Sequence, residues 1–120
     1  RDGRLAPCPD RPNCVSSQAS DLDHAIAPLP FQGDAAAAAA SLAGVIRAMP
    51  RASLVTAKPG YLHAEFASAT MGFVDDAEFA VDAAAHVIHV RSAARLGRSD
   101  FGVNRKRVDA IRAAFAAVHP

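Results

Sequence analysis

Apolar and polar residues alternate along two neighbouring segments of the chain, residues 73–82 and 86–93. This alternation is typical of β-strands that bury one face and leave the other in water. If the two apolar faces are aligned across an antiparallel ladder, Glu78 lies directly opposite Arg91. The pattern therefore predicts two adjacent antiparallel strands with an ion pair between these two side chains.

A second pair of strands is predicted immediately upstream, over residues 52–58 and 61–68. Pro59–Gly60 joins them and favours a tight turn, because Pro sets one backbone dihedral and Gly supplies a positive φ. A turn at this place puts Val55 opposite Ala64. The apolar face of the hairpin is then predicted to carry Val55, Leu62, Ala64 and Phe66.

One helix is predicted on each side of these strands. Asp34 can cap an alanine-rich helix by accepting a backbone N–H, and Pro50 ends that helix. Its apolar stripe is Leu42, Val45, Ile46 and Met49. A second helix is predicted after the last strand, with Ser99, Asp100 or Asn104 near its start. Its apolar stripe is Phe101, Val108, Ile111, Phe115 and Val118.

Residues 1–33 hold most of the prolines and no sustained period, which predicts an irregular arm packed on a domain formed by residues 34–120. The arm can be anchored by Val15, Ile26, Leu29 and Phe31. A chain of 120 residues closes one hydrophobic core. The element order predicts an α+β fold, with an antiparallel four-stranded sheet and two helices packed on one face. In the alternative, the arm extends this sheet with an additional strand.

The charge balance gives no global attraction to nucleic acid or to an anionic membrane. Thirteen Lys and Arg stand against twelve Asp and Glu, and aromatic residues are few. We therefore expect no nucleic-acid partner. No stretch approaches the ~20 apolar residues of a membrane span. The sequence starts at Arg1 rather than Met, which is compatible with an upstream signal peptide, lipid-attachment segment or membrane anchor.

The two cysteines, Cys8 and Cys14, are separated by a short segment with two prolines. These prolines restrict the chain and can bring the sulfurs together, so we favour a disulfide. A structural zinc site is disfavoured because it takes four ligands and there is no second cysteine pair. Pairing points to a periplasmic or other extracytoplasmic location. We expect no metal and no cofactor.

Three stretches of sequence carry a resemblance to a known family. They are residues 8–18, with Cys-Pro and Pro-Asn-Cys-Val-Ser-Ser-Gln; residues 73–79, Phe-Val-Asp-Asp-Ala-Glu-Phe; and residues 90–107, with Val-Arg-Ser and Ser-Asp-Phe-Gly-Val-Asn-Arg. Together they resemble the family called domain of unknown function 1499. Ala94 departs from the pattern, since serine is expected there in many relatives. The resemblance implies that homologues are often envelope or lumen proteins with an N-terminal targeting or lipid-attachment segment, and it supplies no catalytic residues.

The polar face of the predicted sheet is the first candidate site. It carries His63, Glu65, Asp76, Glu78, His89 and Arg91. Histidines and carboxylates together can ligate a divalent metal or perform acid–base chemistry, so an enzyme that uses this face, with or without a metal, is the alternative function. A solvated outer sheet face with cross-strand ion pairs explains the same residues.

The second candidate site is the arginine-rich run of residues 91–107, which leads into the predicted C-terminal helix. Guanidinium groups and the N–H groups of a helix start suit a phosphate or carboxylate ligand. The residues expected to bind this anion are Arg91, Arg95, Arg98, Ser99, Asn104 and Arg105. In the structural alternative, Asp75 or Asp76 holds an arginine and Asp100 caps the helix.

The preferred hypothesis is a non-enzymatic envelope domain that binds a small anionic ligand or a protein partner through the arginine-rich run. A third hypothesis is a structural accessory subunit. A hydrolase that uses Ser16 or Ser17 with His24 is disfavoured, because the sequence has no nucleophile-elbow pattern.

Overall fold

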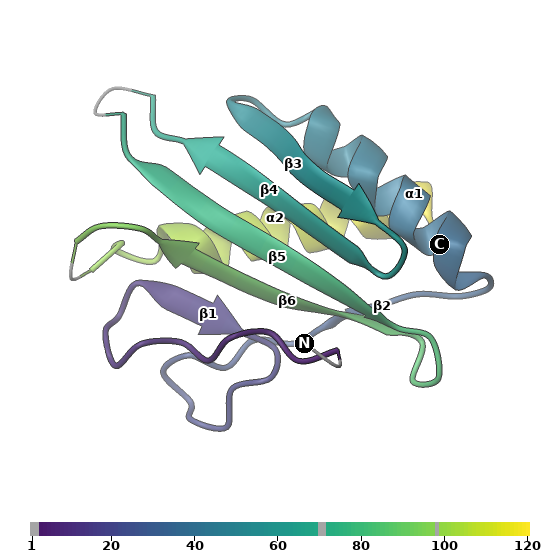
Figure 1. The fold of residues 1–120 in the computed structure, drawn as a ribbon, viewed down its shortest axis with the longest axis horizontal. Coiled ribbons are helices and arrows are strands. Elements are labelled where there is room, and N and C mark those ends of the chain that lie inside the picture. The colour runs from purple at the N-terminus through teal and green to yellow at the C-terminus, as the bar shows by residue number, and fades with distance from the viewer. Residues whose placement is uncertain (1–2, 70–71, 98) are drawn as a thin grey trace.

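The computed structural model describes residues 3–69, 72–97 and 99–120 and shows an α+β fold (Figure 1). The elements in chain order are β1 (Cys14–Ser16), β2 (Leu29–Pro30), α1 (Ala35–Arg47), β3 (Ala52–Lys58), β4 (Tyr61–Ala67), β5 (Val74–Asp82), β6 (Val87–Ala94) and α2 (Val103–Val118). The strand order is β1-β6-β5-β4-β3, and β2 also pairs with β6. The predicted fold class is confirmed. The sheet has six strands rather than four because the arm adds β1 and β2, as in the alternative considered above.

The ladder between β5 and β6 follows the alternation of the sequence. Phe79 pairs with Val90 on the apolar face, and Glu78 pairs with Arg91 on the other. Arg91 Nη1 lies 3.9 Å from Glu78 Oε1, so the predicted register and ion pair are confirmed. A one-residue slip would move every apolar side chain of this ladder into water, which is why the pattern fixes the register.

The register predicted for β3 and β4 is correct only next to the turn. Lys58 pairs with Tyr61, but the ladder shifts between Leu54 and Thr56, and Leu54 takes the place opposite Ala64 that was predicted for Val55. Val55 is the extra residue of this bulge, and 52% of its surface is exposed. The prediction that Val55 belongs to the buried face is therefore wrong, because a bulge moves one residue out of the two-residue period.

Figure 1 shows α2 crossing behind the middle of the sheet and α1 alongside β3 at the edge of the sheet. The apolar faces of the strands are buried beneath them. The largest fully buried apolar side chains are Leu29, Leu42, Ile46, Phe79, Ile88, Val90, Val108, Ile111 and Phe115. The opposite face of the sheet is left to polar side chains.

An aspartate accepts a backbone N–H near the start of each helix. Asp34 Oδ2 accepts from the backbone N–H of Ala37 at 2.9 Å, which confirms the predicted cap of α1. At α2, Asp100 Oδ2 accepts from the backbone N–H of Asn104 at 3.1 Å. Phe101 precedes this helix and is 89% exposed, and Val118 at the other end is exposed as well. The predicted stripe of α2 is therefore wrong at both ends, because it extends past the turns that contact the sheet.

The arm is fastened to the β6 edge of the sheet. β1 pairs with the second half of β6 and β2 with the first half. Cys8 and Cys14 form a disulfide, as predicted. Val15, Leu29 and Phe31 are buried in the same core as the helices. Among the described residues, no helix is long and apolar enough to cross a membrane.

Candidate functional site

The outer sheet face brings together the polar residues that the alternation predicted. β4 supplies His63 and Glu65, which stand two residues apart and so point to the same side. The ladder sets Asp76 opposite Glu65 and Glu78 opposite His63. Because the two helices cover the other face, these side chains gather on the open one.

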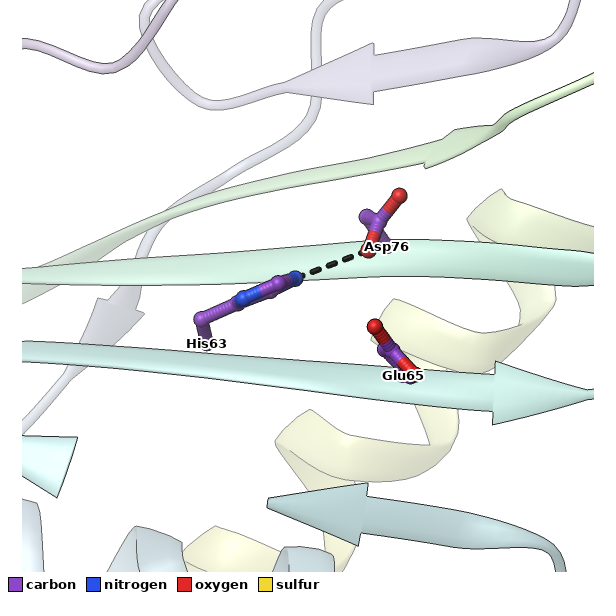
Figure 2. A group of neighbouring side chains, drawn as sticks. All are labelled: His63, Glu65 and Asp76. Atoms are coloured by element: carbon purple, nitrogen blue, oxygen red, sulfur yellow. Dashed lines mark hydrogen bonds and ion pairs between the residues drawn. The ribbon is translucent and has the colours of Figure 1, made fainter. Parts of the chain in front are cut away.

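One half of this face is a histidine–carboxylate cluster formed by His63, Glu65 and Asp76 (Figure 2). His63 Nε2 lies 2.8 Å from Asp76 Oδ1. Arg95 donates to Asp76 Oδ2 through Nε at 2.7 Å and to Glu65 Oε2 through Nη2 at 2.5 Å. The guanidinium of Arg95, followed by the hydrogen bond from His63, holds the pKa of Asp76 below its usual range. Asp76 is therefore a carboxylate with cationic or polar partners on two sides.

The other half of the face centres on Glu78. Tyr61 donates its phenol O–H to Glu78 Oε2. Burial of the phenol, followed by this hydrogen bond, raises the pKa of Tyr61. Arg91 contacts the arm by donating from Nη2 to the carbonyl of Pro7 at 3.4 Å. The buried Arg91 Nε has no hydrogen-bond partner among the described residues.

A serine–histidine contact lies at the β6 edge of the same face. Ser17 Oγ lies 3.1 Å from His89 Nδ1 and accepts from the backbone N–H of Val90 at 2.8 Å. His89 Nε2 is 3.9 Å from Asp82 Oδ2. The serine oxygen accepts a backbone hydrogen bond that fastens the arm to β6, and the contact with His89 joins the same two segments.

The arginine-rich run does not form one surface. Arg91 and Arg95 lie on the outer sheet face, whereas Arg105 donates to the carbonyl of Ala25 in the arm at 3.0 Å. Ser99 Oγ accepts from the backbone N–H of Phe101 at 3.2 Å. The expected anion ligand Arg98 lies outside the described residues.

Asn104 is completely buried between β6 and α2, where it joins a polar network. Its Oδ1 accepts from Ser92 Oγ at 2.5 Å and from Arg107 Nη1 at 2.8 Å. Its Nδ2 donates to Asp100 Oδ2 at 2.8 Å. Arg107 Nη1 also donates to Asp75 Oδ2 at 2.8 Å. The network is a set of hydrogen-bonded side chains, buried at Ser92 and Asn104 and half-buried elsewhere, that links the sheet to the helix.

A pocket of about 460 Å³ lies beneath the connection from β6 to α2. Its rim carries the exposed apolar side chains Phe73, Leu96, Phe101 and Val103. Arg107 and Arg51 line it as well. Arg51 has a φ of 58°, a left-handed conformation that is uncommon for residues other than glycine. A larger pocket of about 590 Å³ between α1 and the β3–β4 turn is lined mainly by alanines.

Comparison with protein-family models decides the family. The model described as "Protein of unknown function (DUF1499)" matches residues 4–115 of the 120-residue chain. The chain belongs to the DUF1499 family. No curated protein and no solved structure matches it.

Two residues of this DUF1499 domain that matter for its sites were missed as site candidates in the sequence. The alternative in which Asp75 or Asp76 holds an arginine is confirmed, since Arg107 pairs with Asp75 and Arg95 with Asp76, but only the fold shows that the partner of Asp75 is Arg107. Arg51 follows Pro50 between α1 and β3, where nothing in the local pattern marks a site. The positive φ of Arg51 is visible only in the structure.

Proposed function

We propose that this DUF1499 domain is a non-enzymatic binding domain of the cell envelope that holds a small anionic ligand beneath its arginine-rich run. The observation that carries the proposal is the pocket of about 460 Å³, which has an exposed apolar rim and is also lined by Arg51. This volume lies within the range of about 300–1,000 Å³ that is typical of small-molecule sites.

The charges around the pocket favour an anion. Asp75 is neutralised by its ion pair with Arg107. Asp100 accepts backbone N–H groups at the start of α2, where a negative charge is compensated by the helix dipole. The side chain of Arg51 has no ion pair among the described residues, so its positive charge remains for a ligand.

The apolar rim points to a ligand that is amphipathic rather than a bare ion. Covering exposed aromatic and aliphatic side chains with a ligand contributes a favourable free energy of about 25 cal/mol for each Å² of apolar surface removed from water. We therefore propose a carboxylate or phosphate that carries an alkyl chain, with the anionic group at Arg51 and the chain against Phe73, Leu96 and Phe101.

The disulfide supports placing this function outside the cytoplasm. Cys8 and Cys14 are paired, and such bonds persist in oxidising compartments. We therefore propose that the domain binds its ligand in the periplasm or in a lumen, because the disulfide is stable there.

Thermal shift with matched amphiphiles tests the proposal. Decanoate and decyl phosphate, used below their micelle concentrations, are expected to stabilise the protein by about 1.4 kcal/mol at ten times Kd, whereas decyltrimethylammonium is not. Anion binding here would be refuted if the melting temperature were the same with and without each anion. It would also be refuted if the cation raised the melting temperature as much as the anions do.

The Arg51→Gly variant separates binding from folding. Glycine tolerates the left-handed backbone of Arg51, so this variant should fold at least as well as the wild type and bind decanoate about tenfold more weakly. Lys106→Gln is the matched control, because it removes one exposed charge from neighbouring α2 that does not line the pocket. Equal loss in both variants would mean that only general surface charge attracts the ligand.

A further inference from the structure

The histidine–carboxylate cluster of His63, Glu65 and Asp76 is built on the most regular part of the sheet. The ladder between β4 and β5 runs without a shift from Tyr61 to Ala67, and it sets Asp76 directly opposite Glu65. His63 stands two residues before Glu65, on the same face. Figure 2 shows the three side chains converging above the two strands. Backbone hydrogen bonds therefore fix the positions from which these groups project.

The cluster has the size of a metal coordination sphere. One ligand atom from each residue can be chosen so that all three lie within 4.8 Å of one another. Metal–ligand bonds of about 2.0–2.2 Å place ligand atoms about 3 to 4 Å apart, so small side-chain rotations suffice. An imidazole nitrogen together with two carboxylates is a donor set for a divalent transition ion such as Zn²⁺.

The guanidinium of Arg95 already occupies the cation position of this cluster. It makes two hydrogen bonds to Asp76, at 2.7 and 2.9 Å, and a third to Glu65. One positive charge faces two carboxylates, so the cluster keeps a negative charge that a divalent ion would neutralise. Arg95 follows the last residue of β6, and its side chain is 45% exposed. It can swing into water without disturbing the sheet.

We propose that His63, Glu65 and Asp76 form a binding site for a divalent transition-metal ion of the Zn²⁺ class, and that Arg95 is the internal cation that the metal displaces. This site is separate from the pocket beneath the arginine-rich run. The affinity of this site for the metal ion is set by competition with the guanidinium of Arg95.

Calorimetric titration of tag-free protein with ZnCl₂ tests the site, and Co²⁺ absorption reports the ligand set. Arg95→Gln removes the competing cation and should bind Zn²⁺ about tenfold more tightly than the wild type. Arg95→Lys keeps a charge without the forked geometry and should fall between the two. Adding His63→Ala to Arg95→Gln should weaken Zn²⁺ binding about 100-fold, because a ligand is lost.

His86→Asn is the matched control. His86 lies in the turn between β5 and β6 with a φ of 55°, which asparagine tolerates, and the variant should bind Zn²⁺ like the wild type. Far-ultraviolet circular dichroism checks that each variant is folded. If Arg95→Gln does not fold, Arg95→Lys takes its place in the comparison with the wild type.

Three results would overturn the proposal. They are a folded Arg95→Gln protein that binds Zn²⁺ no better than the wild type, binding that survives the loss of His63, and binding that disappears with His86. Arg51→Gly should leave Zn²⁺ binding unchanged, so failure of this site and failure of the anion pocket can be told apart.

Discussion

The ion pair between Arg107 and Asp75 is expected to contribute more to stability than any surface pair of the domain. Both side chains are only 14% exposed, and Arg107 Nη1 lies 2.8 Å from Asp75 Oδ2. The same guanidinium donates to Asn104 and lies over the ring of Phe66, 4.7 Å from its centroid. Arg107→Met keeps much of the side-chain volume but leaves the Asp75 carboxylate with little water and without its cation.

The expected loss follows from these contacts. Removing one partner of a buried ion pair costs about 3–5 kcal/mol, and the residual exposure of Asp75 places the loss at the lower end, near 3 kcal/mol. Total stability of a domain of this size is about 5–15 kcal/mol, so the variant should unfold at a clearly lower urea concentration. In a double-mutant cycle with Asp75→Asn, the coupling should be about 2 kcal/mol.

Urea unfolding with the disulfide intact measures these free energies, provided that the slope with urea is the same for all variants. Arg112→Met is the control, since Arg112 pairs with Asp109, whose side chain is 61% exposed, and also donates one hydrogen bond to the carbonyl of Ala27, as Arg107 does to Asn104. Its loss should be about 1 kcal/mol or less. If Arg107→Met costs no more than Arg112→Met, the view that burial sets the value of this pair is wrong.

Three further predictions test the arm, a titrating side chain and the bulge. Replacing Cys8 and Cys14 by serine should lower stability by about 2 kcal/mol, the loop entropy of a short ring, and an unchanged urea midpoint would show that the disulfide does not restrain the unfolded chain. The pKa of His24 is raised by its hydrogen bonds to the carbonyl of Arg11 and to Asp21, so its stabilisation is complete below the ordinary value of 6.5 and is lost as pH rises through the folded value. The melting temperature of the wild type minus that of His24→Gln should therefore shrink as the pH is raised above 6.5, and a constant difference would contradict this linkage. Val55→Thr should change stability by less than about 0.5 kcal/mol, against about 3–5 kcal/mol for Phe79→Ala, and similar losses at the two positions would place Val55 in the core after all.

The sequence by itself determined the features that depend on neighbours along the chain. The two-residue alternation set the faces of β4, β5 and β6, and with them the pairing of Glu78 with Arg91. Asp34 caps its helix through a backbone N–H three residues on, which is also a local contact. The alternation likewise predicted that His63, Glu65 and Asp76 would share the polar face of the sheet. Each of these follows from the geometry of one strand, one turn or one helix end.

Local pattern failed where a single residue breaks the period. Val55 is apolar and stands in phase with the strand, but it is the extra residue of the bulge, and Leu54 takes the place opposite Ala64. Phe101 is in phase with the apolar stripe of α2, but the helix begins only at Val103, so its ring extends into water. A hydrophobic pattern is read from residue types alone, and neither the bulge nor the helix start alters them. The pattern therefore cannot show where either one lies.

Only the tertiary structure decided how the arginines are used. Residues adjacent in the run from β6 into α2 leave the chain in different directions, so Arg95 lies over the outer face while Arg107 turns inward to Asp75. The same packing buries Asn104 and brings Arg51, distant in sequence, to the pocket beneath the run. The partner of a charged side chain depends on how whole helices and strands pack against one another. The spacing of residues along one strand or helix does not reveal that packing.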